Sequence, residues 1–321
     1  MITTALTALL GVTHPILAAP MAGVTGIALA RAVSDAGGFG IVGGGYGDRG
    51  WLAEQTDDAD CSLLGIGFIT WRLADNPALL EMALDRRPKA ILLSFGDVQP
   101  FVTQIKSGSA LCIAQVQSLE DARAAADAGA DVIVAQGTEA GGHGGARATL
   151  PLVPAVVDAV SPLPVVAAGG IGDGRGLAAA LMLGAAGVMM GTRFYCSAES
   201  LAPNAAKLRA VESGGDQTIR SSVFDVLRGY DWPAPYKLRT IANAMTTRFG
   251  SGLDALNREK AAQTGIFERA ISAEDFDIAA VIAGEALDLV GDVPGAADIV
   301  ARTVEQAVAC LRQPTHFSVS E

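Results

Sequence analysis

The stretch DVIVAQGTEAGGHGG, residues 131–145, joins a short apolar run to a glycine-rich loop. The run at 132–135 has the length of a strand that is buried on both faces. Gln136 ends the run, and His143 stands in the loop among four glycines. These glycines are Gly141, Gly142, Gly144 and Gly145. Because glycine allows close backbone approach to a ligand, the loop predicts a functional site with His143 as its titratable group. The alternative is a loop histidine that merely bonds a carbonyl.

The junction before this strand recurs along the chain. DAGA at 127–130 precedes DVIV, DAGG at 35–38 precedes FGIV, and LGAA at 183–186 precedes GVMM. Each reads as a helix end, a glycine turn and a buried strand, which is typical of parallel βα units. The predicted strands cover 16–21, 39–45, 62–69, 90–96, 111–116, 131–137, 164–171 and 187–194. Eight such units favour a (β/α)8 TIM barrel over a doubly wound sheet.

A dinucleotide-binding Rossmann unit is the main alternative for a chain of βα units. It requires GxGxxG after the first strand and an acidic residue about 20 positions later. The first predicted strand is instead followed by MAGVTG, residues 21–26, which lacks that pattern. The sequence therefore does not support a Rossmann fold.

The composition shifts after Tyr195, where aromatic and polar residues become more frequent. Two helices are predicted near 252–263 and 275–290, and an amphipathic helix is predicted over 297–312. The last helix would complete the barrel, which would then comprise 1–200 and 295–321. Residues 201–294 would form a mainly helical insertion over the barrel mouth. A plain C-terminal helical extension is the alternative.

The charge balance limits the classes of partner. The chain has 321 residues, a net charge of −11 and only 18% charged residues, which argues against nonspecific binding to nucleic acid or an anionic membrane. Its four cysteines are far apart and form no CxxC pair, so neither a zinc site nor any other metal is expected. Neither a signal peptide nor a bilayer-spanning run is apparent, so we expect a cytoplasmic protein.

Two glycine turns follow the seventh and eighth predicted strands, where TIM barrels commonly bind phosphate. The first, at 168–174, opens a helix, and its backbone amides and the helix dipole suit an anion. The second, at 190–193, adds the Thr192 hydroxyl. Asp173 is expected to cap a turn or helix, and Arg193 is either a phosphate partner or an ion-pair residue. A cofactor ring would lie across the strand ends, beside residues 20–22 and 65–68, although Met21 is equally suited to filling the core.

Five motifs resemble the nitronate monooxygenase family, formerly called 2-nitropropane dioxygenases. They are APMAGVTG (19–26), GGFGIVGGG (37–45), QGTEAGGHGG (136–145), AAGGI (167–171) and MMGTRF (189–194). The resemblance covers about residues 10–200, and 224–249 also looks like that family's insertion. FMN-dependent enoyl-acyl-carrier-protein reductases and some NADH:quinone reductases share the barrel, so the motifs identify a superfamily better than one reaction.

The resemblance implies an FMN-binding TIM barrel with His143 as the catalytic residue. The residues that it assigns to FMN are Pro20, Met21, Ala22, Gly67, Gln136, Gly141, Gly142, Gly169, Gly170, Met190, Gly191 and Thr192. Many family members carry an asparagine in a GVN motif where this chain has GIG at 65–67. That flavin contact is therefore absent here.

The implied reaction is oxidation of an alkyl nitronate by O2 to a carbonyl compound and nitrite. His143 would either hold the anionic nitro group or remove the α-proton of a neutral nitroalkane. One alternative is an NAD(P)H-dependent reductase acting on an enoyl thioester or quinone, and another is a flavin-binding sensor. A homodimer is an expectation that the sequence leaves open.

Overall fold

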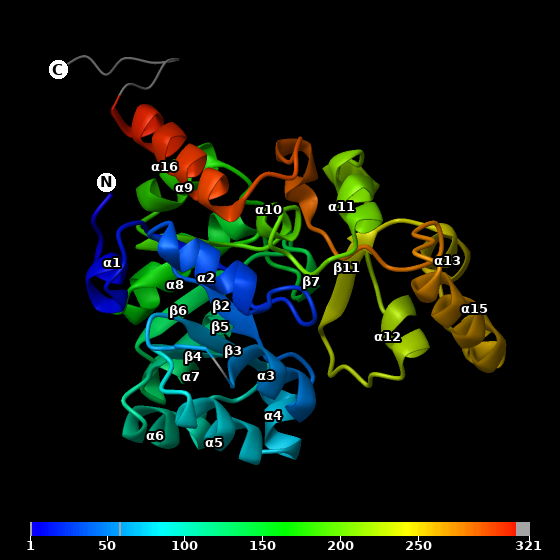
Figure 1. The fold of residues 1–321 in the computed structure, drawn as a ribbon, viewed down its shortest axis with the longest axis horizontal. Helices are drawn as coiled ribbons and strands as arrows, with labels where there is room; N and C mark the ends of the chain where they lie inside the picture. Colours follow the sequence, from blue (N-terminus) through cyan, green and yellow to red (C-terminus); the bar gives the residue numbers. More distant parts are fainter. Residues whose placement is uncertain (1, 58, 313–321) are drawn as a thin grey trace.

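The computed structural model describes residues 2–57 and 59–312. Its main sheet has eight parallel strands in the order β1-β9-β8-β6-β5-β4-β3-β2. They are β1 (Ile16–Ala18), β2 (Ile41–Gly43), β3 (Gly65–Ile69), β4 (Ala90–Ser94), β5 (Leu111–Val116), β6 (Val132–Gln136), β8 (Val165–Ala168) and β9 (Gly187–Met190). A parallel bridge between Leu17 and Phe39 joins the two edges, so the sheet closes and the predicted TIM barrel is confirmed (Figure 1).

Helices surround this barrel (Figure 1). They are α2 (Ile27–Asp35), α3 (Arg49–Thr56), α4 (Thr70–Asp75), α5 (Ala78–Asp85), α6 (Gln99–Ser107), α7 (Leu119–Asp127), α8 (Thr149–Val160), α9 (Gly174–Met182) and α16 (Ala296–Arg312). The helix α16 packs against α9 and α2. A short helix, α1 (Ala5–Leu10), places Leu6 and Leu10 in the cluster that fills the barrel. None of the described helices is long and apolar enough to cross a membrane.

The side chains of each strand alternate between two separate buried clusters, as the two-residue period of a strand requires. Leu17, Ile113 and Val134 belong to the cluster inside the barrel. Ile16, Cys112 and Ile133, their sequence neighbours, belong to the larger cluster between the strands and the helices. The apolar runs of the sequence are therefore buried on both faces, which is why they show no alternation with polar residues.

The chain between β9 and α16 forms a further set of elements, most of which lie to one side of the barrel in Figure 1. They are α10 (Thr192–Tyr195), α11 (Asn204–Val211), β10 (Thr218–Ser221), α12 (Val223–Arg228), β11 (Lys237–Ile241), α13 (Ala244–Phe249), α14 (Asp254–Arg258) and α15 (Lys260–Ser272). A short strand of the histidine loop, β7 (Gly142–Gly144), pairs with β11, giving a three-stranded sheet in the order β10-β11-β7. The division into a barrel and an insertion covering its mouth remains our interpretation, and residues 313–321 of the proposed barrel lie outside the described residues.

One of the two helices predicted in this segment is wrong. The prediction near 252–263 corresponds to α14 and α15, but 275–290 contains no α-helix, only the 3-10 turn η2 (Glu285–Leu289). Val281 and Ala283 pack in one cluster, whereas Ala280 and Ile282 pack in another. Residues 280–284, between a turn and η2, form no helix and pack their alternate side chains on opposite sides, and such a two-sided apolar run looks like a buried helix in a sequence.

Candidate active site

At the carboxyl end of each barrel strand, the last side chain that points into the barrel contributes to a ring around the mouth. Part of this ring, the small arc, has only small side chains, and the other part, the polar arc, has polar ones. These positions follow the inward-facing residues of each strand by the two-residue period. In order around the barrel they are Ala19, Gly191, Ala168, Gln136, Gln115, Ser94, Gly67 and Gly43. Five neighbouring strands thus carry only alanine or glycine, and the other three carry polar side chains. A flat ligand with one polar edge would fit against this ring of residues.

The polar arc consists of two buried amides and the Ser94 hydroxyl, which donates to the Phe68 carbonyl oxygen. Gln115 and Gln136 are 9% and 8% exposed, and Gln117 Nε2 donates to Gln136 Oε1 at 2.8 Å. Among the described residues, the side chain of Gln115 has no hydrogen-bond partner, so its amide is available to a ligand. Buried polar side chains ordinarily find partners, which makes this arc a candidate recognition surface.

The two glycine turns lie side by side at the ends of β8 and β9. Gly169 and Gly170 have φ of +104° and +71°, which side-chain-bearing residues rarely adopt. Within the described chain, the backbone amides of Gly170, Gly191 and Thr192 donate to no protein acceptor. The Thr192 Oγ1 accepts from the amide of Gly284 at 2.9 Å, which leaves its proton free. Several unpaired amides close together suit the oxygens of a phosphate.

The helix α9 that follows the first turn does not contribute its amino terminus to this cradle, contrary to the prediction. Asp173 caps the helix by accepting from the amides of Arg175 and Gly176, and Gln306 Oε1 accepts from Gly174. Because these amides are satisfied within the protein, the anion site reduces to the two turns. The expected capping role of Asp173 is confirmed.

Arg193 is an ion-pair residue rather than a phosphate partner. Its guanidinium is buried and contacts Asp292 Oδ1 at 3.0 Å, and it also donates to the carbonyl oxygens of Cys196 and Asp292. The guanidiniums of Arg302 and Arg193 hold the pKa of Asp292 below its usual value. The alternative that the sequence left open is thereby decided.

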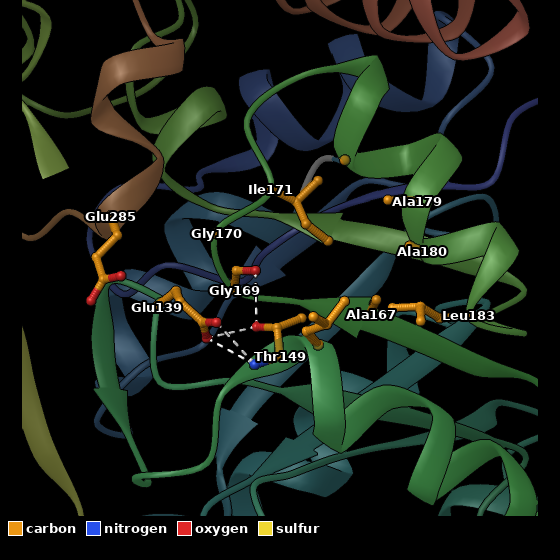
Figure 2. Close-up of a pocket in the computed structure, with 12 residues that line it drawn as sticks. Glu139, Thr149, Ala167, Gly169, Gly170, Ile171, Ala179, Ala180, Leu183 and Glu285 are labelled. Atoms are coloured by element: carbon orange, nitrogen blue, oxygen red, sulfur yellow. Dashed lines mark hydrogen bonds between the residues drawn. The ribbon is translucent and has the colours of Figure 1, made fainter. Parts of the chain in front are cut away.

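A pocket of about 350 Å³ lies outside the barrel, behind the first turn and between α8 and α9 (Figure 2). Glu139 and Thr149 form its polar end, where the Thr149 amide and hydroxyl donate to the Glu139 carboxylate. Glu285 also lines this pocket. Two carboxylates make it unsuited to an anion, so a phosphate held by the turns would not occupy it.

His143 lies on β7, opposite Leu238 of β11, and is 7% exposed. Its Nε2 lies 2.9 Å from Oδ1 of Asp225 on α12. Nδ1 has no protein partner among the described residues. Burial lowers the pKa of the imidazole below its usual value and outweighs the hydrogen bond to Asp225, which raises it. Burial thus favours the uncharged ring, and Nδ1 is the nitrogen left available to accept a proton.

Aromatic rings surround the imidazole. Trp232 stacks on it with ring centroids 3.4 Å apart and an angle of 11° between the planes, and Phe95 approaches edge-on at 6.3 Å. The Trp232 indole donates to the Tyr46 hydroxyl at 3.0 Å. Tyr46 in turn stacks on Tyr230, and burial raises its pKa to about 12. The approach to His143 is therefore largely apolar and well suited to carbon chains or planar groups.

Arg220 of β10 holds the glycine loop in place. Its guanidinium donates to the carbonyl oxygens of Thr138, Ala140 and Gly142 in the loop, and to that of Lys237. Burial lowers its pKa to about 10. A half-buried cation bonded to loop carbonyls fixes the path of the backbone that carries His143.

The predicted residues of the first strand and of position 67 lie together at the barrel mouth. A side chain at Gly67 would place Cβ 2.4 Å from the Pro20 ring, and one at Gly43 would come within 2.6 Å of the Met21 carbonyl oxygen. The asparagine typical of the family does not fit at 67 against Pro20 as it stands. Close packing of Pro20 therefore explains why this chain carries glycine there.

Met190 and Gly141, two of the residues predicted to contact the cofactor, have structural roles of their own. The Met190 side chain lies in the cluster between strands and helices, so only its backbone faces the mouth. Gly141 packs against residues 283–284, where a Cβ would lie 2.6 Å from the backbone of Ala283. For Gly141, a structural requirement is thus sufficient to explain the glycine.

Sequence reasoning missed Asp225, Trp232, Arg220, Gln115 and Gln117. Asp225 and Trp232 fall in the segment 224–249 that resembles the family's insertion, but nothing local distinguishes them from surface residues. Gln115 and Gln117 end a predicted buried strand, as Gln136 does. A polar residue at the end of an apolar strand could have identified these glutamines as candidate site residues.

Comparisons with known proteins agree with this geometry. The family model for nitronate monooxygenase matches residues 3–59 and 69–306. A nitronate monooxygenase, npaC, of Metarhizium robertsii is 37% identical over 92% of this chain and 91% of its own. A (3aS,4S,5R,7aS)-5-hydroxy-7a-methyl-1-oxo-octahydro-1H-indene-4-carboxyl-CoA dehydrogenase of Mycobacterium tuberculosis is 36% identical, with 69% and 64% covered.

Two solved structures resemble the whole chain. FabK from Thermotoga maritima has a TM-score of 0.85 at 28% identity, with 97% of this chain and 98% of that chain covered. A nitroalkane oxidase from Streptomyces ansochromogenes has a TM-score of 0.80 at 26% identity, with 96% and 99% covered. Both the barrel and the segment that follows it therefore recur in known proteins.

Proposed function

The chain belongs to the nitronate monooxygenase family, and on that premise we propose that it uses FMN and O2 to oxidise alkyl nitronates. It is a flavin-dependent oxidoreductase, like the family to which it belongs. The proposed products are a carbonyl compound and nitrite, and His143 is the proposed catalytic residue. The observation that carries the proposal is a buried histidine, bonded through Nε2 to Asp225 and with no described protein partner at Nδ1, beside a barrel mouth lined by small and polar side chains.

The residues at the mouth fit FMN. The amides of Gly170, Gly191 and Thr192 would hold its phosphate, because they lack protein acceptors and lie in adjacent turns. The ring would lie over the small arc, beside Pro20, Met21 and Ala22 and over Gly67, and its polar edge would face the glutamines. Gln136, Gly141, Gly142, Gly169 and the Met190 backbone complete the proposed set. When bound, FMN supplies the redox chemistry.

The protein's own contribution is to orient the substrate and move a proton. With a nitroalkane, Nδ1 of His143 would accept the α-proton. A preformed nitronate needs no base, and only an imidazole protonated at Nδ1 would donate a hydrogen bond to its nitro group. The aromatic rings around His143 would exclude water from both substrates and so strengthen these polar contacts.

Anaerobic mixing of the purified holoprotein with one electron donor at a time tests this function. The donors are propionate 3-nitronate, NADH and NADPH, and the signal is the flavin absorbance. We expect the nitronate to change the absorbance and the pyridine nucleotides to leave it unchanged over the same time. Rapid bleaching by NADH or NADPH with no response to nitronate would instead establish a reductase. A protein that binds no FMN would exclude both.

A second candidate is a dehydrogenase or reductase acting on a large thioester. It is supported by the extent of the aromatic surface, which exceeds what a three-carbon nitronate needs, and by the relative named as a carboxyl-CoA dehydrogenase. The same nitrogen of His143 would serve, since the carbon beside a thioester also carries an acidic proton. An acyl-CoA in place of the nitronate in the mixing experiment separates the two candidates.

A further inference from the structure

Asp225 is buried, and among the described residues its only side-chain partner is the catalytic candidate. Its side chain is 4% exposed and contacts His143 Nε2 at 2.9 Å through Oδ1. Its other oxygen, Oδ2, is buried without a hydrogen-bond partner in the described chain. The helix α12 that carries it is anchored by Val223, Phe224 and Leu227 in an apolar cluster. The carboxylate is therefore held in a fixed place next to the imidazole.

Such a residue is a poor choice for stability alone. Moving a carboxylate out of water is costly unless both oxygens are bonded, and here one of them is not. The apolar residues of α12 already fix the helix without it. Retention of a half-satisfied buried acid is therefore better explained by what it does to His143.

The contact determines which imidazole nitrogen carries the proton. A carboxylate only accepts hydrogen bonds, so in the neutral ring Nε2 must be the donor. Nδ1 is then the unprotonated nitrogen, and Trp232 stacked on the ring limits rotation out of this plane. Asp225 thus holds the edge of the imidazole and Trp232 covers its face, and both residues belong to the chain between β10 and β11.

We propose that Asp225 is a positioning residue that keeps His143 in the Nε2–H tautomer, so that Nδ1 serves as the base for neutral nitroalkanes. In that step the Cα–H bond breaks, the proton goes to Nδ1, and the electron pair stays on the substrate as the nitronate. This inference rests on the proposed function. It implies that Asp225 matters for nitroalkanes and much less for nitronates formed beforehand.

The groups that face His143 set the direction of the pH effect. They are Asp225 and Arg228 of α12 and Arg220 of β10, while Phe95 and Trp232 are uncharged. Asp225 raises the pKa of the imidazole and the two arginines lower it. Loss of the carboxylate therefore lowers the pKa further, and the acidic limb of the kcat/KM profile moves to lower pH.

The decisive experiment compares Asp225→Asn with Asp231→Asn in the holoenzyme, using nitroethane and preformed ethyl nitronate. Asp231 is an exposed acid on the same segment, and its side chain forms no hydrogen bond or ion pair with a described residue, so it controls for loss of charge. For Asp225→Asn we expect kcat/KM on nitroethane to fall at least about tenfold, against the roughly 10²–10⁴-fold contribution of a general base. Activity on the nitronate stays within about twofold, FMN content is unchanged, and Tm does not fall. An unchanged nitroethane-to-nitronate activity ratio would overturn the proposal.

A readout without turnover keeps the proposal separate from the proposed function. In holoprotein labelled with [15N]histidine, His143 assigned by the His143→Ala spectrum should show the Nε2–H tautomer. Asp225→Asn and Asp225→Ala should each reduce that tautomer or lower the pKa of the imidazole. An Nδ1–H tautomer in the wild-type protein would refute the role of Asp225. If the wild type oxidises neither substrate, the nitro-compound function is wrong, and these spectra still decide what Asp225 does.

Discussion

At the barrel mouth, five neighbouring strands end in alanine or glycine, whereas the segment 201–294 brings Asp225, Arg220 and Trp232 against the histidine loop. The barrel contributes space and backbone amides where its side chains are small, and a polar arc with two glutamines elsewhere. The segment contributes charge, hydrogen bonds and aromatic surface. The proposed cofactor site and the proposed substrate site thus differ in which part of the chain builds them, and variants in one should leave the other intact.

The largest effect is expected where the two parts meet. His143→Ala removes the free imidazole nitrogen, so activity should fall by about 10²–10⁴-fold. FMN content should remain that of the wild type, because the proposed phosphate contacts are backbone amides elsewhere. Turnover and flavin absorbance, measured on the same samples, give the activity and the FMN content. The control is His14→Ala, which lies before the amino-terminal end of β1, away from the barrel mouth. Undiminished turnover would remove His143 from the mechanism.

Gly191→Val tests the barrel side alone. Position 191 has an ordinary φ, and a Cβ there first meets Ala19 Cβ at 3.6 Å, so the fold should tolerate it. The valine would instead occupy the space of the proposed phosphate and lower FMN occupancy. We expect a largely colourless protein with a circular dichroism spectrum and a Tm close to those of the wild type without flavin. Full occupancy by FMN would contradict the phosphate site.

The smallest effect is expected for Trp232→Leu, which alters the segment side alone. The stack of Trp232 on His143 contributes about 0.5–1.5 kcal/mol to holding the imidazole in place, so kcat/KM should fall by up to about tenfold with FMN content unchanged. Burial is the main reason for the low pKa of His143, and a smaller side chain relieves it. The pKa therefore rises, and the acidic limb of kcat/KM moves to higher pH, opposite to the shift for Asp225→Asn. Trp51→Leu, on α3, is the control, and equal profiles for both variants would show that Trp232 does not cover the imidazole.

Much of the barrel could be predicted from local patterns. Buried strands, glycine turns and helix caps such as Ser118 on α7 follow from neighbours within a few residues. The helix wrongly predicted at 275–290 shows where local patterns fail, because long-range packing decides the structure there. Its apolar residues are shared between two clusters from different elements, and no local signal separates that case from a buried helix.

The features of the candidate site also fall into those set by residues adjacent in the chain and those set by long-range contacts. The sequence by itself determined the barrel class, the histidine loop and the two glycine turns, because each depends on residues adjacent in the chain. Only the tertiary structure decided that Asp225, 82 residues from His143, holds the imidazole, and that Asp173 and Gln306 occupy the amides of α9. Those contacts depend on how β11 pairs with β7 and how α16 packs on α9, which are long-range choices of the folded chain.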